Sequence, residues 1–567
     1  MTASRSRPHI AGSERKEANM KALAPAVAIA ISCTAAILLS TEVTHTQAGS
    51  CFVATTAGHI QGLDRGSSCA FLGIPFAAPP TGPLRWRRPQ PAASWAPATF
   101  NATAAPPSCA QLSAANGQPT GVEDCLMLNI WTPDPLPAWG APVIVWLHPG
   151  GFANASANFA PQNGQTLAAL TGAIVVAPNY RLGPFGFLGH AALAVEDSAA
   201  GNYGLLDQRA ALAWVRTHIA AFGGDPDNVT IAGQSAGAHS VSLHLVAPGS
   251  SGLFHRAIMQ SGYASYRLRT AADARQQGDE FATALGCTGA DAATVAACLR
   301  SRTQNQVLAA RPPGQFEEFS ETGRTQWSPI VDGVEIPDQP RYLYEQGAFT
   351  RVPVLLGANR DEGWTSVNRS FPSGLTAVQY ETAVETEFDH DAPAILAKYP
   401  AADFASPKDA LARVVGDAEF VCEANRVARL IERTGAPVFL YSFEYEVDPV
   451  VLDRVVHGLE VNFVFGNNFG PPLFTPYVLG AADLALFRTI SGYWTRFART
   501  GNPNTDDANV VHWPAFKHPT AAGRGADKYL AFDVTVIEGK RQRETQCDFW
   551  EPFFWRSISG VVPASAP

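Results

Sequence analysis

Short apolar runs alternate along this chain with segments in which apolar residues recur every three or four positions. The runs Pro142–Leu147 and Ala173–Ala177 are rich in valine and isoleucine, which is typical of strands buried on both faces of a sheet. The clearest helical pattern spans Gly204–Val215, where Leu205, Leu212 and Val215 fall near one helical face. This alternation predicts an α/β fold with a mostly parallel central sheet flanked by helices.

The pattern becomes irregular after residue 265, where proline-rich and aromatic segments predict helices and loops over the carboxyl edge of the sheet. Two apolar runs in this half, Val352–Leu356 and Val438–Tyr441, still predict strands. No internal repeat, low-complexity tract or long linker divides the chain. We therefore expect one large domain over residues 49–567.

Residues 1–48 have the pattern of a signal peptide. Lys21 precedes the apolar stretch Ala22–Leu39, and small residues at Thr46–Ala48 offer a cleavage site. Met20 resembles a more ordinary start than Met1, so residues 1–19 are a possible upstream extension. A transmembrane anchor is the alternative, because about 18 apolar residues could just span a bilayer. Cleavage predicts a secreted or periplasmic protein without a stable membrane anchor.

Composition supports a globular protein with a large core and a sparsely charged surface. The chain has 567 residues, of which 46% are hydrophobic and 16% are charged, against roughly 25% charged in an average soluble protein. Its formal net charge is −9. Nucleic acid is therefore not an expected partner.

Export determines how the cysteines are interpreted, because paired thiols form cross-links in an oxidising compartment. Two pairs each bracket a short loop, a third pair rests chiefly on elimination, and the fourth closes a long loop worth roughly 4–5 kcal/mol by chain entropy. In that order the pairs are Cys109 with Cys125, Cys287 with Cys298, Cys51 with Cys69, and Cys422 with Cys547. A few free buried thiols are the alternative.

The sequence Gly233-Gln234-Ser235-Ala236-Gly237 follows the apolar run Val229–Ala232 and leads into a helical segment. A G-x-S-x-G between strand and helix predicts a nucleophile elbow. Glycine and alanine leave room for the strained turn that such a serine needs. Ligands of parallel sheets bind outside the carboxyl ends of the strands, which is where Ser235 is expected to lie.

A serine needs donors that stabilise the oxyanion formed on attack. The candidate is the segment His148-Pro149-Gly150-Gly151-Phe152, directly after the strand that ends at Leu147. Glycines allow backbone N–H groups to approach a ligand closely. An ordinary glycine-containing turn is the alternative interpretation of this segment.

A serine also needs a base and an acid. Among the thirteen histidines, His239 and His244 follow the serine on the predicted helix, and we expect them to pack there. His457 lies in a loop-like stretch after a predicted strand, and Glu362, with Asp361 as the adjacent rival, lies in a turn after another. The resulting order of serine, acid and histidine is that of α/β-hydrolases.

These motifs together resemble the type B carboxylesterase and cholinesterase family of α/β-hydrolases, and the resemblance covers most of the chain. The motifs that carry it, besides the elbow, are Phe71–Ala77, Glu123–Asn129, Asn179–Gly183 and Phe222–Pro226. The resemblance implies an α/β-hydrolase fold. It also implies hydrolysis of carboxylic esters, including small-molecule or lipid-like esters, through an acyl-enzyme, with no cofactor or metal.

The resemblance assigns roles to individual residues. The triad is Ser235 as nucleophile, His457 as base and Glu362, rather than Asp361, as acid; the oxyanion donors are Gly150, Gly151 and Ala236; and Ser261 matches a position near the acid. The family also supports three of the expected disulfides, Cys109–Cys125, Cys287–Cys298 and Cys422–Cys547.

The chain departs from the family pattern at three places. Pro149 stands where the family usually has glycine, and Gln234 stands where glutamate is commoner. No tryptophan lies between Cys109 and Cys125, so the aromatic platform that holds a quaternary ammonium in cholinesterases has no counterpart there. Choline esters are therefore poor candidates as substrates.

The alternatives to a carboxylesterase are a lipase, a polyester-degrading esterase and, in a different class, a catalytically dead relative that serves as a binding or adhesion ectodomain. Such relatives typically lack the serine or the histidine, whereas this chain has all three triad residues. Acyl and alcohol preference and oligomeric state do not follow from these motifs.

Overall fold

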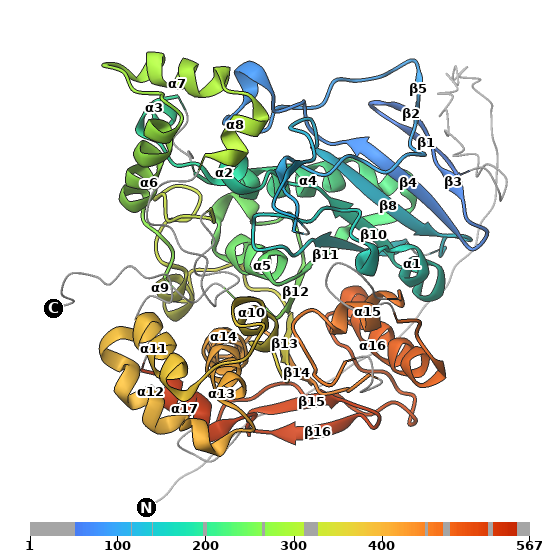
Figure 1. The fold of residues 1–567 in the computed structure, drawn as a ribbon. Coiled ribbons are helices and arrows are strands. Elements are labelled where there is room, and N and C mark those ends of the chain that lie inside the picture. The colour runs from blue at the N-terminus through green and yellow to red at the C-terminus, as the bar shows by residue number, and fades with distance from the viewer. Residues whose placement is uncertain are drawn as a thin grey trace, which may run out of the picture. The chain divides into compact units, whose positions relative to one another are not determined.

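A sheet of 11 strands forms the centre of the structure (Figure 1). The computed structural model describes residues 51–552 except 115, 139, 197–200, 264–266, 311–326, 448–451, 469–476 and 520–525. In their spatial order the strands are β16 (Ile537–Lys540), β15 (Lys528–Phe532), β14 (Val438–Phe443), β13 (Val354–Asn359), β12 (Arg256–Gln260), β11 (Gly224–Gln234), β9 (Ala141–Leu147), β10 (Ile174–Pro178), β8 (Met127–Pro133), β4 (Ser68–Pro75) and β3 (Leu63–Asp64).

All neighbours from β15 to β10 are parallel, and the remaining pairs at both edges are antiparallel. This confirms the mostly parallel central sheet. Every residue of β9 and β10 is buried, as expected for strands that are covered on both faces. The predicted strands at Pro142–Leu147 and Ala173–Ala177 each differ from the observed ones by one residue at one or both ends.

The 17 α-helices of the described residues lie mainly between the parallel strands in the sequence. They are α1 (Gln165–Thr171), α2 (Gly183–Phe187), α3 (Ala191–Ala194), α4 (Tyr203–His218), α5 (Ala236–Val246), α6 (Ala271–Ala284), α7 (Ala292–Ser301), α8 (Gln304–Ala309), α9 (Pro340–Glu345), α10 (Trp364–Ser370), α11 (Ala377–Phe388), α12 (Ala392–Lys398), α13 (Pro407–Gly416), α14 (Cys422–Glu432), α15 (Glu460–Phe465), α16 (Ala481–Thr500) and α17 (Glu544–Trp550).

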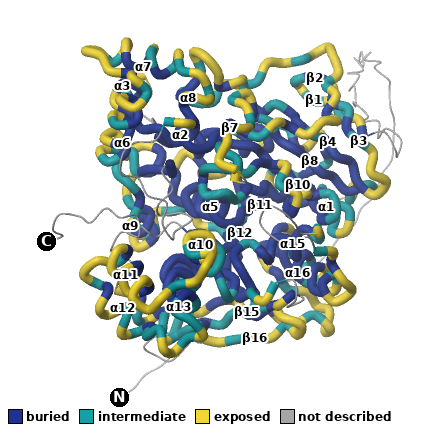
Figure 2. The backbone as a smooth tube through the Cα atoms, viewed as in Figure 1, coloured by how far each residue is buried: buried dark blue, intermediate teal, exposed yellow. Residues whose placement is uncertain are grey.

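Alternating side chains of the strands divide the core into two layers. In β9, Val143, Val145 and Leu147 pack in one cluster with residues of α4, α5 and α14, whereas Ile144 and Trp146 pack in another with residues of α1, α15 and α16. Successive side chains of a strand point to opposite faces, so these helices cover opposite faces of the sheet. Figure 2 shows the buried residues along the central strands and the exposed ones on the outer helices and loops.

The half of the chain after residue 265 contains the expected helices, α6 to α14, over much of its length. The antiparallel edge formed by β15 and β16 was not predicted from the sequence. Two small sheets were not predicted either, one of β1 (Phe52–Thr55), β2 (Gly58–Gln61) and β5 (Thr99–Asn101), and one of β6 (Gln111–Leu112) and β7 (Pro119–Thr120). These strands are short, so they have little apolar periodicity to read.

The four expected disulfides are all present: Cys51–Cys69, Cys109–Cys125, Cys287–Cys298 and Cys422–Cys547. The first three span 11 to 18 residues of sequence, whereas the last joins residues 125 positions apart. Cys422 begins α14 and Cys547 lies in α17. This bond therefore ties the last helix of the described chain to a helix that covers the sheet.

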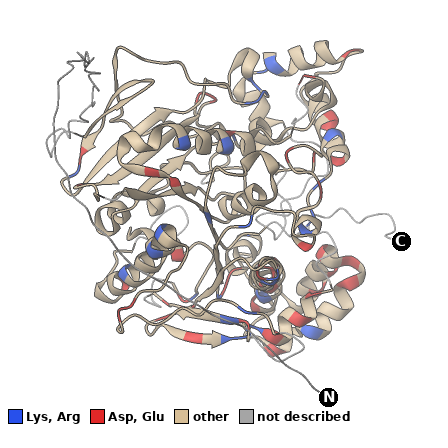
Figure 3. Cartoon of the chain, turned by 180° about the vertical axis from the view of Figure 1, so that it is seen from behind, with Lys and Arg blue, Asp and Glu red and all other residues tan. Residues whose placement is uncertain are grey.

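The proposed signal segment, residues 1–48, lies outside the described residues. Among the residues that are described, no helix is long and apolar enough to cross a membrane. Seen from behind in Figure 3, the central strands carry few charges, and acidic side chains gather on α11 and the turn Asp389–Asp391 that follows it. Glu381, Glu385 and Asp389 are exposed there.

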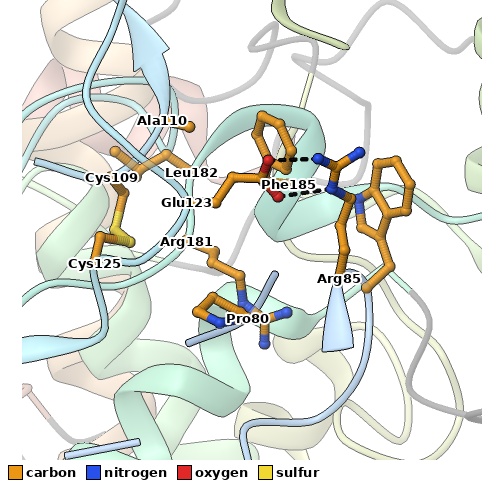
Figure 4. Close-up of a pocket in the computed structure, with 10 residues that line it drawn as sticks. Pro80, Arg85, Cys109, Ala110, Glu123, Cys125, Arg181, Leu182 and Phe185 are labelled. Carbon is orange, nitrogen blue, oxygen red and sulfur yellow. Dashed lines mark hydrogen bonds and ion pairs between the residues drawn. A yellow bond between two sulfur atoms is a disulfide. The ribbon is translucent and has the colours of Figure 1, made fainter. Parts of the chain in front are cut away.

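A buried ion pair connects the amino-terminal segment to the Cys109–Cys125 loop. Arg85 donates to both carboxylate oxygens of Glu123, at 2.6 and 2.5 Å, and to the carbonyl oxygen of Arg302 at 2.6 Å. Figure 4 shows the pair and the disulfide lining the same small pocket. The two side chains are only 8% and 11% exposed, so neither charge is well solvated by water.

We expect Arg85→Met to lower the free energy of unfolding by about 3–5 kcal/mol, because it leaves a buried carboxylate without its partner. The matched control is Arg87→Met. The Arg87 side chain is 40% exposed and pairs with Glu196, and an exposed ion pair of this kind contributes about 0–1 kcal/mol to stability. Urea unfolding of both variants measures the difference. Equal losses in the two variants would show that the Arg85 pair contributes no more than a surface pair.

Candidate active site

The three predicted triad residues lie after the carboxyl ends of parallel strands. Ser235 directly follows β11, Glu362 follows β13 in a turn, and His457 lies in the loop between β14 and α15. Because β11 to β14 are parallel neighbours in the sheet, these loops emerge at the same edge. The fold therefore brings to one sheet edge three side chains that span 222 residues of sequence, from Ser235 to His457.

The turn at Ser235 has a left-handed backbone, with φ 52° and ψ −125°. It is confined by close backbone contacts on both sides. A Cβ atom at Gly233 would lie 2.5 Å from the carbonyl carbon of Gly237, and one at Gly237 would lie 2.0 Å from the carbonyl oxygen of Leu147. These distances explain why the pattern around the serine has glycine at both ends, and the geometry is that of the predicted elbow.

Glu362 contacts the imidazole of His457 directly. Its Oε2 atom lies 2.5 Å from Nδ1 of His457, and its Oε1 atom accepts a hydrogen bond of 2.6 Å from the backbone N–H of Asn359. Glu362 is 1% exposed and His457 8%. A carboxylate at Nδ1 keeps a proton on that nitrogen, which leaves the lone pair of the neutral ring on Nε2.

Asp361, the rival acid, has different contacts. Its Oδ2 atom accepts from the backbone N–H of Val455 at 3.0 Å and from Nε of Arg360 at 3.1 Å. Asp361 also lines a cavity of about 240 Å³ with Arg413 and Arg454. Of the two adjacent carboxylates, Glu362 is therefore the one that bonds the imidazole of His457, while Asp361 holds the loop that carries it.

The Nε2 atom of His457 lies 3.0 Å from the side-chain nitrogen of Gln234. The Oγ atom of Ser235 is buried and has no hydrogen-bond partner in the described structure. Besides Glu362 and Gln234, the ring of His457 also contacts Phe420, whose ring centre is 4.9 Å away. Phe420 belongs to a π-helical turn, Asp417–Val421, and such turns are frequent at functional sites.

Neither contact of His457 was predicted from the sequence. Gln234 lies beside the serine in the sequence, but its contact with His457 joins segments 223 residues apart and has no local signal. Phe420 lies 37 residues before His457, and nothing in its surroundings in the sequence indicates that the two rings meet.

The candidate oxyanion donors lie in two segments, the glycine loop after β9 and the start of α5. Gly150 and Gly151 have φ values of 111° and 60°, and Ala236 is the first residue of α5. Among the described residues, no hydrogen bond uses the backbone N–H of any of the three. Helix N-terminal N–H groups lack partners within the helix, so the N–H of Ala236 is available to a ligand.

The loop that carries these glycines is held from outside the candidate site. The hydroxyl of Tyr180 donates to the carbonyl oxygen of His148 at 2.8 Å, and the two rings stack with centres 4.2 Å apart. The Nδ1 atom of His148 lies 2.8 Å from the carbonyl oxygen of Pro149. Burial lowers the pKa of His148 to about 4, so the ring is neutral at pH 7 and donates its Nδ1 proton to that carbonyl.

Pro149 lacks an N–H, so it contributes no donor to the candidate oxyanion hole. We expect Pro149→Gly to keep turnover within roughly tenfold of the parent, since the loss of one oxyanion donor costs about 10²–10³ and this change removes none. Steady-state kinetics on a soluble ester measure the effect. If turnover rose a hundredfold instead, Pro149 would be impairing the oxyanion hole of the natural protein. That result would favour the binding-module alternative, a catalytically dead relative that serves as a binding or adhesion ectodomain.

Two further residues border the triad. Ser261 has φ 52° and donates its backbone N–H to the carbonyl oxygen of Gly357 at 2.9 Å, on the strand that leads to Glu362. Glu460 is 1% exposed and accepts from Asn359 at 2.5 Å and from Gln260 at 3.2 Å. Burial and the nearby Glu362 raise the pKa of Glu460. Glu460 lies three residues after His457, and nothing in the sequence around it indicates a place beside the triad.

The two histidines that follow the serine pack within α5, as expected. His239 contacts the carbonyl oxygen of Ser235 at 2.9 Å through Nδ1. His244 lies between Ser250 and Gln208, at 2.8 and 3.1 Å, and burial lowers its pKa to about 3. In the part of the chain that the structure describes, no group of three or more His, Cys, Asp or Glu side chains could hold a metal ion.

Comparison with known families agrees with this geometry. A model of the carboxylesterase family matches residues 49–550, which include the whole sheet and every candidate site residue. The mostly parallel sheet with helices on both faces is the α/β-hydrolase fold of that family. The chain belongs to the carboxylesterase family, a family of carboxylic ester hydrolases.

Proposed function

We propose that this chain is an exported serine carboxylesterase that hydrolyses esters through an acyl-enzyme on Ser235. The observation that carries the proposal is the 2.5 Å contact between Glu362 and Nδ1 of His457, placed at the same edge of the sheet as the strained serine turn. A histidine bonded to a carboxylate, on the same sheet edge as a strained serine turn, supplies the three groups of a catalytic triad.

In the first half of the reaction, Ser235 Oγ attacks the ester carbonyl carbon and its proton passes to Nε2 of His457. The resulting imidazolium is stabilised by the carboxylate of Glu362. The carbonyl oxygen, now an anion, accepts hydrogen bonds from the N–H groups of Gly150, Gly151 and Ala236. The tetrahedral intermediate collapses, the C–O bond to the alcohol breaks, and the alcohol leaves with the proton that His457 returns.

In the second half, water replaces the alcohol. His457 takes a proton from the water, the hydroxide attacks the acyl carbon, and the proton returns to Ser235 Oγ as the carboxylic acid leaves. The reaction consumes one ester and one water and yields one acid and one alcohol. Neither a metal nor a cofactor enters any step.

Export is part of the proposal. It rests on the signal pattern of residues 1–48 and is supported by the four disulfides, since cross-links of this kind persist in oxidising compartments. Choline esters are poor substrate candidates, because no tryptophan lies in the Cys109–Cys125 loop. A lipase or a polyester-degrading esterase would use the same catalytic groups on a different substrate.

A kinetic panel tests the proposal. The panel varies acyl length and alcohol size in soluble esters and adds an emulsified triglyceride, with Ser235→Ala as the control for background hydrolysis. Saturable hydrolysis of soluble esters supports a carboxylesterase. A sharp rise of activity at the lipid interface would identify a lipase, and no hydrolysis of any ester by the exported protein would favour the binding-module alternative.

A further inference from the structure

The side-chain amide of Gln234 forms a hydrogen bond with Nε2 of His457, the nitrogen that must take the Ser235 proton in the reaction. Its nitrogen lies 3.0 Å from Nε2 of His457, and Gln234 is 2% exposed. The Oγ atom of Ser235, the proton donor of the reaction, makes no hydrogen bond within the described residues. The base is thus bonded to the residue before the nucleophile, and the nucleophile itself has no bond.

The direction of this hydrogen bond follows from the other side of the ring. Glu362 lies at Nδ1, so that nitrogen carries a proton and Nε2 of the neutral ring can only accept. The Gln234 nitrogen therefore donates to the lone pair of Nε2. That lone pair is the one that takes the Ser235 proton in the proposed mechanism, and it can accept one strong hydrogen bond at a time.

We propose that Gln234 is a positioning residue that holds the neutral base of the free enzyme away from Ser235; this inference rests on the proposed serine mechanism. Acylation then requires the Gln234 bond to Nε2 to break before the Ser235 Oγ–H can bond to the same atom. Once the proton has moved to Nε2, that nitrogen is a donor. The amide can then stabilise the imidazolium only through its oxygen, after the side chain turns.

The identity of residue 234 determines this behaviour. A glutamate, the commoner residue of the family at this place, is an acceptor when ionised and cannot donate to a neutral Nε2. Glutamine presents a donor to the neutral ring instead. Three described groups near the ring contact other atoms than Nε2: Glu362 bonds Nδ1, Phe420 packs against the ring, and the Glu460 carboxyl is held by Asn359 and Gln260.

The loop after the base leaves space for the amide. Gly458 has φ 82°, and a Cβ atom there would lie 3.6 Å from the Gln234 side-chain nitrogen and 3.7 Å from its oxygen. These are ordinary contact distances, so the glycine leaves the width of one atom free between the loop backbone and the amide. The amide has two hydrogen-bonding ends that it can present to the same nitrogen.

The test is the second-order rate constant for labelling of Ser235 by a small organophosphate, measured on the free enzyme at pH 8. Gln234→Met has nearly the same volume and no donor. Removing a competing hydrogen bond of ordinary strength should increase the rate roughly 2- to 10-fold. The matched control is Gln208→Met, a buried glutamine whose amide donates to Ser240 instead, and it should leave the labelling rate unchanged.

Gln234→Glu provides a second measurement, should the methionine variant fail to fold. Its carboxylate cannot donate to neutral Nε2 and favours the imidazolium, so the labelling rate at pH 8 should rise while the acid limb of its pH profile moves upward by at least about one unit. Unchanged or slower labelling in either folded variant overturns the inference. Absence of labelling in the parent enzyme would instead overturn the proposed function.

Discussion

Replacing Ser235 with alanine is expected to reduce ester turnover by a factor on the order of 10⁴–10⁶, and replacing His457 with alanine is expected to do the same. The serine variant loses the nucleophile, and the histidine variant loses the group that accepts its proton. Steady-state kinetics on a soluble ester measure both losses. Mass spectrometry after treatment with an organophosphate should place the label on Ser235 of the parent and nowhere in the serine variant.

The two variants should differ in stability. Ser235 Oγ makes no hydrogen bond in the described structure, so its removal should leave the free energy of unfolding nearly unchanged. Removal of the His457 ring takes the hydrogen-bond donor from the buried Glu362 and a packing partner from Phe420, so this variant should be less stable. A serine variant that keeps substantial turnover and is still labelled at another residue would refute the assignment.

Glu362→Gln is expected to lower turnover by roughly 10³–10⁴, while Asp361→Asn should cost less than tenfold. The glutamine keeps the shape of the acid but removes the charge that stabilises the imidazolium of His457. The asparagine keeps an acceptor for the backbone N–H of Val455, which is the contact that Asp361 makes with the loop of the base. Comparison of kcat for the two variants on one ester decides between the carboxylates.

Both variants must be shown to fold before their kcat values are compared, because both carboxylates are at least partly buried and their replacement could destabilise the protein. Circular dichroism and urea unfolding should show native secondary structure in both variants. The reverse ranking, with Asp361→Asn the more damaged in kcat, would mean that the acid of the triad is Asp361. Equal and small effects would mean that His457 works without a carboxylate partner, which would contradict the triad itself.

Much of the fold could be predicted because its signals are local. Continuous valine- and isoleucine-rich runs mark β9 and β10, since strands buried on both faces need no polar side chain. The helical period of Gly204–Val215 marks α4, which the structure extends to Tyr203–His218. The short strands of the small sheets and the β15–β16 edge could not be found, because none of them is a continuous run of valine and isoleucine and each is too short to show a period.

Some residues of the candidate site could be predicted from the sequence and others could not. Ser235 and the glycines of the oxyanion segment stand in contiguous patterns that reflect a strained turn and close backbone approach, so sequence alone can indicate them. Glu362 could be separated from Asp361 only through the family resemblance, because two adjacent carboxylates in one turn look alike until their directions are known. The contacts of Phe420 and Gln234 with His457 depend on packing between distant segments, which local patterns do not encode.

The cross-link at Cys422 bears on how the protein can be produced. Cys422 directly follows the π-helical turn that presses Phe420 against the ring of His457, and it is bonded to Cys547 in the last described helix. On chain-entropy grounds the loss of this bond costs about 4–5 kcal/mol, a large part of the roughly 5–15 kcal/mol that keeps a typical domain folded. A chain synthesised for purification in a reducing cytoplasm would lack it. The choice of expression host therefore changes the fraction of purified protein that is folded, and with it the activity measured per milligram.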